Sequence, residues 1–166
     1  MGERPGAVFL VGFMGAGKST VGKVLARLIG WDFVDLDELI VASERRGIPE
    51  IFAREGEAYF RRVERGILAS LRGRTRLIVA CGGGTYENEE SRLLIDRMGR
   101  AVWIQVPLRQ ALARCTGGEE RPLLKDDAQA EALYRRRLPT YRAAGLHVDA
   151  DGLSAEEVAE RIAGML

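Results

Sequence analysis

The chain has 166 residues, of which 46% are hydrophobic and 30% are charged, and this suits one globular domain over residues 1–166 with a buried core. Its 25 basic and 24 acidic residues leave a net charge of +1, which excludes the strong positive field typical of proteins that bind nucleic acid or anionic membranes. We therefore expect small molecules as partners, and neither nucleic acid nor a membrane.

Short apolar runs alternate with segments of helical periodicity, as is typical of an α/β fold whose parallel sheet is covered by helices on both faces. The first strand is predicted at 7–11. A helix follows, in which apolar residues recur every three or four positions until Gly30 ends it. The rest of the chain predicts, in order, a strand at 33–35, a helix at 49–71, a strand at 77–81, a helix at 89–97, a strand at 101–106, helices at 108–114 and 128–143, a strand at 147–149 and a helix at 154–165.

The connection between the first strand and the first helix carries the clearest motif. Residues 12–19 read GFMGAGKS and match the phosphate-binding pattern G-x-x-x-x-G-K-[ST]. Glycines let backbone N–H groups surround an anion, and the helix N-terminus adds partial positive charge. Lys18 would reach the β- and γ-phosphates, and the Ser19 hydroxyl would bind Mg²⁺. The motif predicts ATP and Mg²⁺ as cofactors, with nucleotide contacts from Gly12, Gly15, Ala16, Gly17, Lys18, Ser19 and Thr20.

The phosphate-binding motif does not identify the phosphoryl acceptor, because switches, motors and metabolite kinases share it. A GTPase would carry an Asn-Lys-x-Asp motif, which this sequence lacks, and the D-x-x-G letters at 96–99 fall at the end of a predicted helix. Oligomeric ATPases normally need a longer chain. A small-molecule kinase is the remaining interpretation.

Two carboxylates, Asp35 and Asp37, follow the second strand, where ligands of a parallel sheet are expected. Their alternate positions in an extended chain would point both side chains the same way. One could act on Mg²⁺ and the other could bind or deprotonate an acceptor hydroxyl. They could equally be acidic residues at a helix N-terminus, because Glu38 follows. The local pattern leaves both interpretations open.

A charged segment at 116–127 stands apart from the periodic elements, with Gly117 and Gly118 near its start. It could be an ordinary surface loop. In a nucleotide-dependent kinase, a charged loop with a glycine hinge is also what a closing lid requires.

The two cysteines, Cys81 and Cys115, form neither a disulfide framework nor a metal-binding spacing, so we expect a reducing, cytoplasmic compartment. No signal-peptide pattern precedes the first apolar run, which is too short to span a bilayer. His147 is the only histidine and lies in a strand-like context. We expect it to have a structural role.

Four separated motifs and two later segments occur here in the order found in shikimate kinases, and the sequence resembles that family over nearly its whole length. They are GFMGAGKST at 12–20, DLD at 35–37, FRR at 60–62, CGGGT at 81–85, RPLL at 121–124 and RRLPTYR at 136–142. The resemblance implies a three-layer P-loop kinase fold with strand order 2-3-1-4-5. It also implies a mobile lid at 116–127, a substrate-binding helical segment at 36–65, and a monomer.

The same resemblance implies the reaction, in which ATP phosphorylates the 3-hydroxyl of shikimate to give shikimate 3-phosphate and ADP for aromatic amino-acid biosynthesis. Asp37 would orient the ring hydroxyls and accept the proton. Arg61 and Arg137 would hold the carboxylate, and the backbone of Gly83 would donate to the substrate. The implied substrate contacts are Asp37, Arg61, Gly82, Gly83, Gly84 and Arg137.

Nucleotide contacts outside the phosphate-binding motif come from the resemblance alone. Asp35 would act through water on the Mg²⁺ coordinated by Ser19, and Arg121 would reach the phosphates from the lid, as a catalytic residue beside Lys18 and Asp37. Arg114 would contact the adenine, although the loop at 149–155 carries Ala155 where the family commonly has proline.

Other interpretations remain at this stage. Arg61 and Arg137 could lie on solvated helix faces, because each has arginine neighbours. The acceptor could be gluconate or another hydroxy acid, or a nucleoside monophosphate. The chain could also bind ATP without turnover, although that role would not require the full set of catalytic residues.

Overall fold

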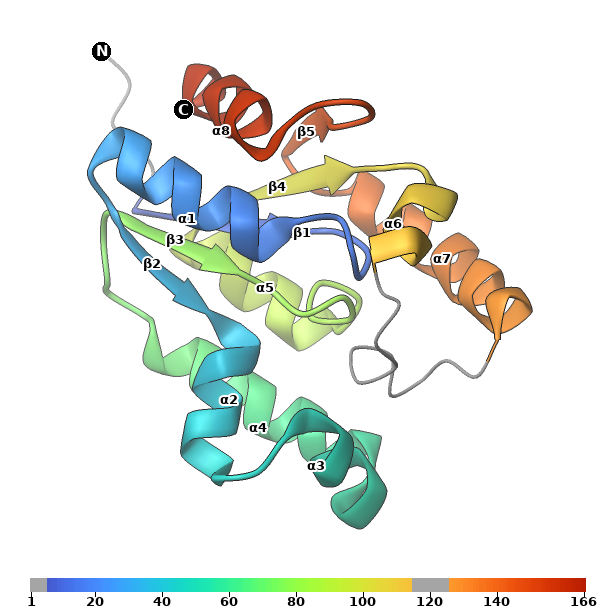
Figure 1. Cartoon of the computed structure of the whole chain (residues 1–166). Coiled ribbons are helices and arrows are strands. Elements are labelled where there is room, and N and C mark those ends of the chain that lie inside the picture. The colour runs from blue at the N-terminus through green and yellow to red at the C-terminus, as the bar shows by residue number, and fades with distance from the viewer. Residues whose placement is uncertain (1–5, 115–125) are drawn as a thin grey trace.

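The computed structural model describes residues 6–114 and 126–166. Their five strands form one parallel sheet in the order β2-β3-β1-β4-β5 (Figure 1). This confirms the predicted strand number, direction and order, with only slightly different boundaries. The strands are β1 (Ala7–Val11), β2 (Asp32–Asp35), β3 (Leu77–Ala80), β4 (Gly99–Gln105) and β5 (Leu146–Asp149).

The sheet is most apolar at its centre, where β1 pairs with β3 on one side and β4 on the other. Every residue of β1 and β3 is buried. A strand buried on both faces has a continuous run of apolar residues in place of alternating polar and apolar ones. These two strands could therefore be predicted from their apolar runs alone. The sheet therefore fixes the loop after β1 at the middle of its carboxyl edge.

Helices cover both faces of the sheet, giving the predicted three layers. Helices α1 and α8 pack together on one face, and α5 packs against β4 on the other (Figure 1). The helices are α1 (Lys18–Ile29), α2 (Leu36–Glu44), α3 (Ile48–Glu55), α4 (Glu57–Ser70), α5 (Glu89–Met98), α6 (Leu108–Arg114), α7 (Asp127–Arg142) and α8 (Ala155–Met165).

The single helix predicted at 49–71 is wrong, because the chain forms two helices there. Gly56 separates α3 from α4 with φ 85° and ψ 172°, a conformation open to glycine but strained for other residues. Helices α2, α3 and α4 contact one another beside the sheet and form most of the predicted substrate-binding segment (Figure 1).

Residues 115–125 lie outside the described residues, and with them Arg121 and most of the predicted lid. Only the last two residues of the predicted lid, Asp126 and Asp127, are described. Asp126 is the N-cap of α7 and accepts a hydrogen bond from the Gln129 backbone, and Asp127 begins the helix.

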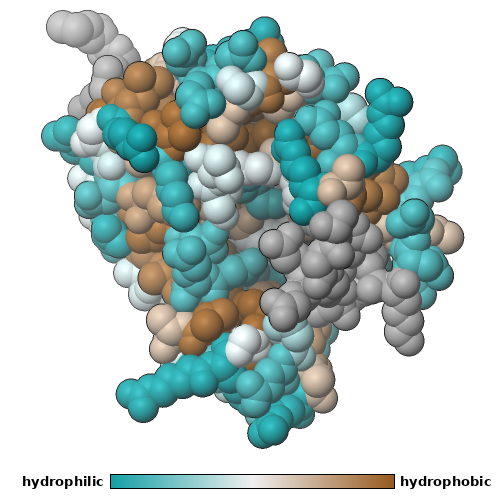
Figure 2. All heavy atoms as spheres, in the orientation of Figure 1, coloured by the Kyte–Doolittle hydropathy of each residue, from teal (hydrophilic) through white to brown (hydrophobic). Residues whose placement is uncertain are grey.

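The surface drawn in Figure 2 mixes hydrophilic side chains with several separate groups of hydrophobic ones. Within the described ranges, the large exposed hydrophobic residues lie on four different helices: Leu28, Val41, Leu93 and Met165. None of the described helices has both the length and the apolar character needed to cross a bilayer.

Candidate active site

The phosphate-binding loop, residues 12–19, connects β1 to α1 at the centre of the sheet's carboxyl edge. Gly15 and Gly17 have φ of 75° and 91°, which a residue with a Cβ atom adopts only with strain. No described side chain caps the N-terminus of α1, and its first turn has no acidic residue. The first N–H groups of α1 are thus left for an anion, which the helix dipole also favours.

Lys18 folds back over this loop and is buried. Its Nζ atom donates hydrogen bonds to the carbonyls of Gly12 (2.5 Å) and Phe13 (3.0 Å). Burial lowers the pKa of Lys18 to about 8, against the opposing effect of the nearby Asp37 carboxylate. The ammonium group is therefore held by backbone carbonyls at the position where phosphate charge would develop.

Asp35 ends β2 and caps α2, because its Oδ1 accepts a hydrogen bond from the Glu38 backbone at 3.1 Å. Its Oδ2 accepts one from the Ser19 hydroxyl. The helix-terminus interpretation is therefore correct, and the same carboxylate also lies beside Ser19. The expectation that Asp35 and Asp37 alternate along an extended chain is wrong, because the cap starts the helix at Leu36.

Asp37 lies in the first turn of α2, and its Oδ1 is buried without a hydrogen-bond partner among the described residues. Burial raises the pKa of Asp37 to about 6, and the carboxylates of Asp35 and Glu64 add to this effect. Lys18 and Arg61 partly offset it. A buried acceptor without a donor is costly, so this oxygen is suited to receive a hydroxyl group from a ligand.

A cavity of about 620 Å³ brings most of the predicted site together at the carboxyl ends of the strands. Among the predicted residues, those that line it are Gly15, Gly17, Lys18, Ser19, Thr20, Asp35, Asp37, Arg61, Gly82, Gly83, Gly84, Arg114 and Arg137. Ala16 lines a neighbouring cavity instead, and Gly12 serves as an acceptor for Lys18.

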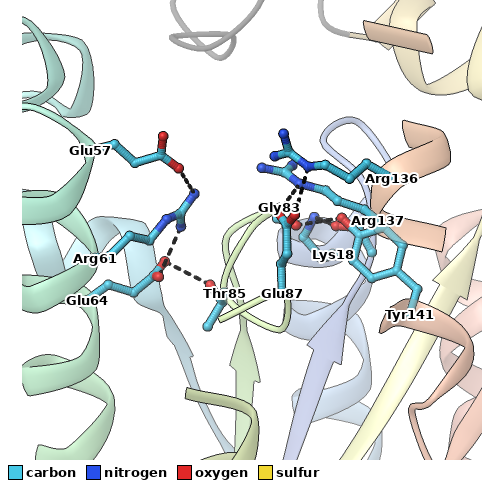
Figure 3. A network of polar contacts seen from close by, with 11 residues as sticks. Lys18, Glu57, Arg61, Glu64, Gly83, Thr85, Glu87, Arg136, Arg137 and Tyr141 are labelled. Atoms are coloured by element: carbon cyan, nitrogen blue, oxygen red, sulfur yellow. Dashed lines mark hydrogen bonds and ion pairs between the residues drawn. The ribbon is translucent and has the colours of Figure 1, made fainter. Parts of the chain in front are cut away.

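Arg61 extends from α4 toward the cavity and is held by two carboxylates. Its Nη1 lies 3.0 Å from Glu64 Oε1, and its Nη2 lies 3.6 Å from Glu57 Oε1. Glu64 is fully buried and also accepts a hydrogen bond from the Thr85 hydroxyl at 2.9 Å. This chain of contacts fixes Arg61 against the turn that follows β3 (Figure 3).

Arg137 approaches the same turn from α7 and is only 2% exposed. Its Nε donates to Glu87 Oε2 at 3.1 Å, and its guanidinium lies over the Phe13 ring, 6.0 Å from the centroid. The Tyr141 hydroxyl, also from α7, donates to the Gly83 carbonyl at 2.5 Å. Figure 3 shows Arg61 and Arg137 coming from opposite sides of the cavity.

The two guanidinium groups meet above the glycine turn, residues 82–84. A Cβ atom on Gly84 would collide with Nη2 of Arg61 and would lie 2.9 Å from Nη2 of Arg137. A Cβ on Gly83 would lie 3.0 Å from Nη1 of Arg137. Both arginines thus direct terminal nitrogens at one small region, which suits the planar, two-pronged binding of a carboxylate.

The family model described as "Shikimate kinase" matches residues 14–166. The chain belongs to the shikimate kinase family. Relatives include the shikimate kinases of Geobacter sulfurreducens, 44% identical over 94% of this chain and 88% of the relative, and of Moorella thermoacetica, 42% identical over 95% and 92%. The family is that of an ATP-dependent kinase with a hydroxyl acceptor.

Solved shikimate kinases share the architecture closely. The enzyme from Acinetobacter baumannii in complex with shikimate has a TM-score of 0.91 and 34% identity, covering 96% of this chain and 92% of its own. The enzyme from Aquifex aeolicus has a TM-score of 0.84 and 37% identity, covering 95% and 94%. A gluconokinase from Sinorhizobium meliloti, at 19% identity and a TM-score of 0.57, shares the fold alone.

Arg114, which the shikimate kinase resemblance assigned to the adenine, lies between two cavities. Its Nη1 donates to the Gly15 carbonyl at 3.2 Å. A second cavity of about 230 Å³ lies beyond it, next to the phosphate-binding loop, and residues from the loop at 149–155 line its far side: Ala150, Leu153 and Ala155. The structure therefore brings together the two segments expected to border an adenine ring.

Three residues of this shikimate kinase site were missed by the sequence reasoning: Glu64, Glu87 and Tyr141. The spacing of Arg61 and Glu64, three residues apart on one helix, could have suggested their ion pair. Glu87 and Tyr141 meet their partners only through the tertiary fold, because β3 and α7 are far apart in sequence. No local pattern signals those two contacts.

Proposed function

We propose that this chain transfers the γ-phosphoryl group of ATP to the 3-hydroxyl of shikimate, giving shikimate 3-phosphate and ADP. The observation that carries the proposal is one cavity with Arg61 and Arg137 at one end and the unpartnered Oδ1 of Asp37 near the phosphate-binding loop. Such a site fits a compact acceptor with a carboxylate and a hydroxyl group. Shikimate has both.

In the proposed reaction, Asp37 accepts the proton of the attacking hydroxyl. A bond forms between that oxygen and the γ-phosphorus while the bond to the ADP oxygen breaks, and Lys18 stabilises the charge on the transferred group. The burial that raises the pKa of Asp37 makes its carboxylate a stronger base at neutral pH, where it is still mostly ionised.

The residues present fit Mg²⁺ as the metal cofactor. The Ser19 hydroxyl and the Asp35 carboxylate are in contact, and oxygen atoms are the ligands that Mg²⁺ prefers. Bound there, Mg²⁺ would neutralise charge on the β- and γ-phosphates.

Two other functions are less well supported. The two convergent guanidinium groups could also bind the phosphate of a nucleoside monophosphate, so it is the match to shikimate kinases that disfavours this acceptor. A module that only binds ATP would gain nothing from a carboxylate with a raised pKa facing the cavity. Gluconate remains the competing carboxylated acceptor.

We propose further that the protein is a cytoplasmic monomer whose partners are ATP and shikimate. The monomeric state is supported by the scattered positions of the exposed hydrophobic residues, because a permanent interface normally buries a continuous apolar patch. Sedimentation at micromolar concentration should give one species of about 18.3 kDa.

Product identification tests the reaction directly. The chain should convert shikimate and ATP to a phosphorylated acid only when Mg²⁺ is present, and phosphorus–proton correlation by NMR should connect the phosphorus to the ring proton at carbon 3. Phosphate on another hydroxyl would overturn the proposed regiochemistry. ATP hydrolysis without a phosphorylated acid would overturn the proposed function.

A further inference from the structure

Glu87 contacts Arg137 of the acceptor site, and the proposed reaction gives Glu87 itself no role. It follows the glycine turn, and its backbone N–H donates to the Gly84 carbonyl at 3.2 Å. Its carboxylate bridges two arginines of α7, accepting from Arg136 Nε at 2.9 Å and from Arg137 Nε at 3.1 Å (Figure 3). Glu87 is thus anchored to the turn at one end and to α7 at the other.

Glu87 binds Arg137 at Nε, and this determines how the guanidinium group is oriented. A guanidinium bound at Nε cannot rotate freely about its stem, yet its two terminal nitrogens stay available. Those nitrogens lie beside Gly83 and Gly84, where Arg61 also points. The guanidinium carbon of Arg137 also lies 6.0 Å from the centroid of the Phe13 ring, which packs against Tyr134 of α7.

We propose that Glu87 is a positioning residue for the phosphoryl acceptor, which holds the Arg137 guanidinium so that its terminal nitrogens face the substrate carboxylate together with Arg61. The inference rests on the proposed function. Glu87 does not touch the substrate in this account. It acts through Arg137, and the pair couples α7 to the glycine turn.

Charge and position predict opposite effects for Glu87, which makes the proposal testable. A carboxylate near the acceptor site repels an anionic substrate, so charge alone predicts tighter shikimate binding when Glu87 is removed. If Glu87 positions Arg137, its removal weakens binding instead, because Arg137 loses its orientation. The sign of the change in KM therefore separates the two roles.

The experiment compares Glu87→Ala and Glu87→Gln with the wild-type chain. We expect KM for shikimate to rise about 5- to 20-fold in Glu87→Ala, as for the loss of one charge-assisted hydrogen bond, and less in Glu87→Gln, whose amide oxygen can still accept from Arg137. KM for ATP and kcat should change little. The melting temperature of Glu87→Ala should fall, because the buried Arg137 loses a charged partner, so circular dichroism at the assay temperature should be used to show that the variants are folded.

A matched control is Glu131→Ala, which removes the exposed partner of Arg135 on the same helix, 2.7 Å away, and should leave KM for shikimate unchanged. A double-mutant cycle gives the decisive readout. In an Arg137→Ala background, Glu87→Ala should no longer raise KM for shikimate, because the residue it positions is absent.

An unchanged or lower KM in Glu87→Ala, or a full effect that persists without Arg137, would overturn the inference while leaving the proposed function intact. Absence of shikimate phosphorylation by the wild-type chain would instead refute the function and the inference together.

Discussion

At the scale of single residues, the acceptor site holds two ionisable groups whose neutral forms are favoured by burial. The pKa of Asp37 is raised to about 6, and that of Lys18 is lowered to about 8. Asp37 must be ionised to accept a proton, and Lys18 must be protonated to stabilise phosphate charge. Both conditions hold only between these two values.

The dependence of kcat/KM on pH should therefore be bell-shaped, since this ratio reports the pKa values of the free enzyme. Activity should fall as pH drops through about 6, where Asp37 becomes protonated, and as pH rises through about 8, where Lys18 loses its proton. Initial rates at low shikimate from pH 5 to 9 test this. A profile that stays flat down to about pH 4.5 would exclude Asp37 as the base.

Asp37→Asn should lower kcat by about 100-fold or more, because the amide can form hydrogen bonds but cannot take a proton. The same change should stabilise the ligand-free protein by about 1 to 2 kcal/mol at pH 7, after discounting the shift for partial exposure, because an ionised carboxylate with a raised pKa opposes folding. The gain should be lost as pH falls from about 6 to about 4, where Asp37 is neutral in the folded state. Urea unfolding of both proteins should show the variant to be more stable than the wild type at pH 7 and equally stable at pH 4.

Arg137→Ala should act on binding instead. Breaking a buried ion pair costs roughly 3 to 5 kcal/mol, reduced to about 2 to 3 in a cavity open to water, which corresponds to a rise of roughly 30- to 150-fold in KM for shikimate. KM for ATP should change little. Arg137→Lys should recover only part of the loss, because an ammonium group cannot make the two-pronged contact. A rise confined to KM for ATP would place the carboxylate elsewhere.

At the scale of elements, the close packing of α1 on the sheet depends on Gly22. A Cβ atom there would lie 2.5 Å from the Phe33 ring of β2 and 3.3 Å from a methyl group of Leu10. Gly22→Ala should destabilise the protein by about 1 to 2 kcal/mol, because overpacking outweighs the better helix propensity of alanine. Gly66→Ala is the control, since a Cβ atom at this exposed position of α4 meets nothing within 4 Å.

Thermal unfolding of the two variants distinguishes packing from propensity. Gly66→Ala should raise the melting temperature, because it adds helix propensity without a steric conflict. An equal increase of the melting temperature in both variants would mean that α1 can move away from Phe33 at little cost in free energy.

Most elements could be predicted from the sequence because their signals are local. The apolar run of β1, the stripe of α1 and the capping box of Ser154 and Glu157 each depend on residues close together in the chain, and all three are present. The break at Gly56 was missed because apolar residues continue on both sides of it. One backbone conformation, rather than any change of periodicity, divides α3 from α4.

At the scale of the whole molecule, the sheet order brings separate segments to one cavity. The loop after β1, the end of β2 and the turn after β3 share one edge because the three strands are neighbours. The phosphate-binding loop and Asp37 could be predicted because motifs mark them. The ion pair of Arg61 with Glu64 lies within α4 at a spacing that could have suggested it. The contacts of Glu87 with Arg137 and of Tyr141 with the Gly83 carbonyl depend instead on how α7 docks, which no sequence pattern specifies.

The central claim is that the cavity selects shikimate as the phosphoryl acceptor. It is tested most directly by comparing kcat/KM for shikimate, gluconate and a nucleoside monophosphate, each with ATP and Mg²⁺ under identical conditions. We expect shikimate to exceed the other two by at least about 1,000-fold, or roughly 4 kcal/mol, because only its rigid ring presents a carboxylate to Arg61 and Arg137 and a hydroxyl to Asp37 at once. Turnover of gluconate or the monophosphate with a kcat/KM equal to or above that of shikimate would contradict the account.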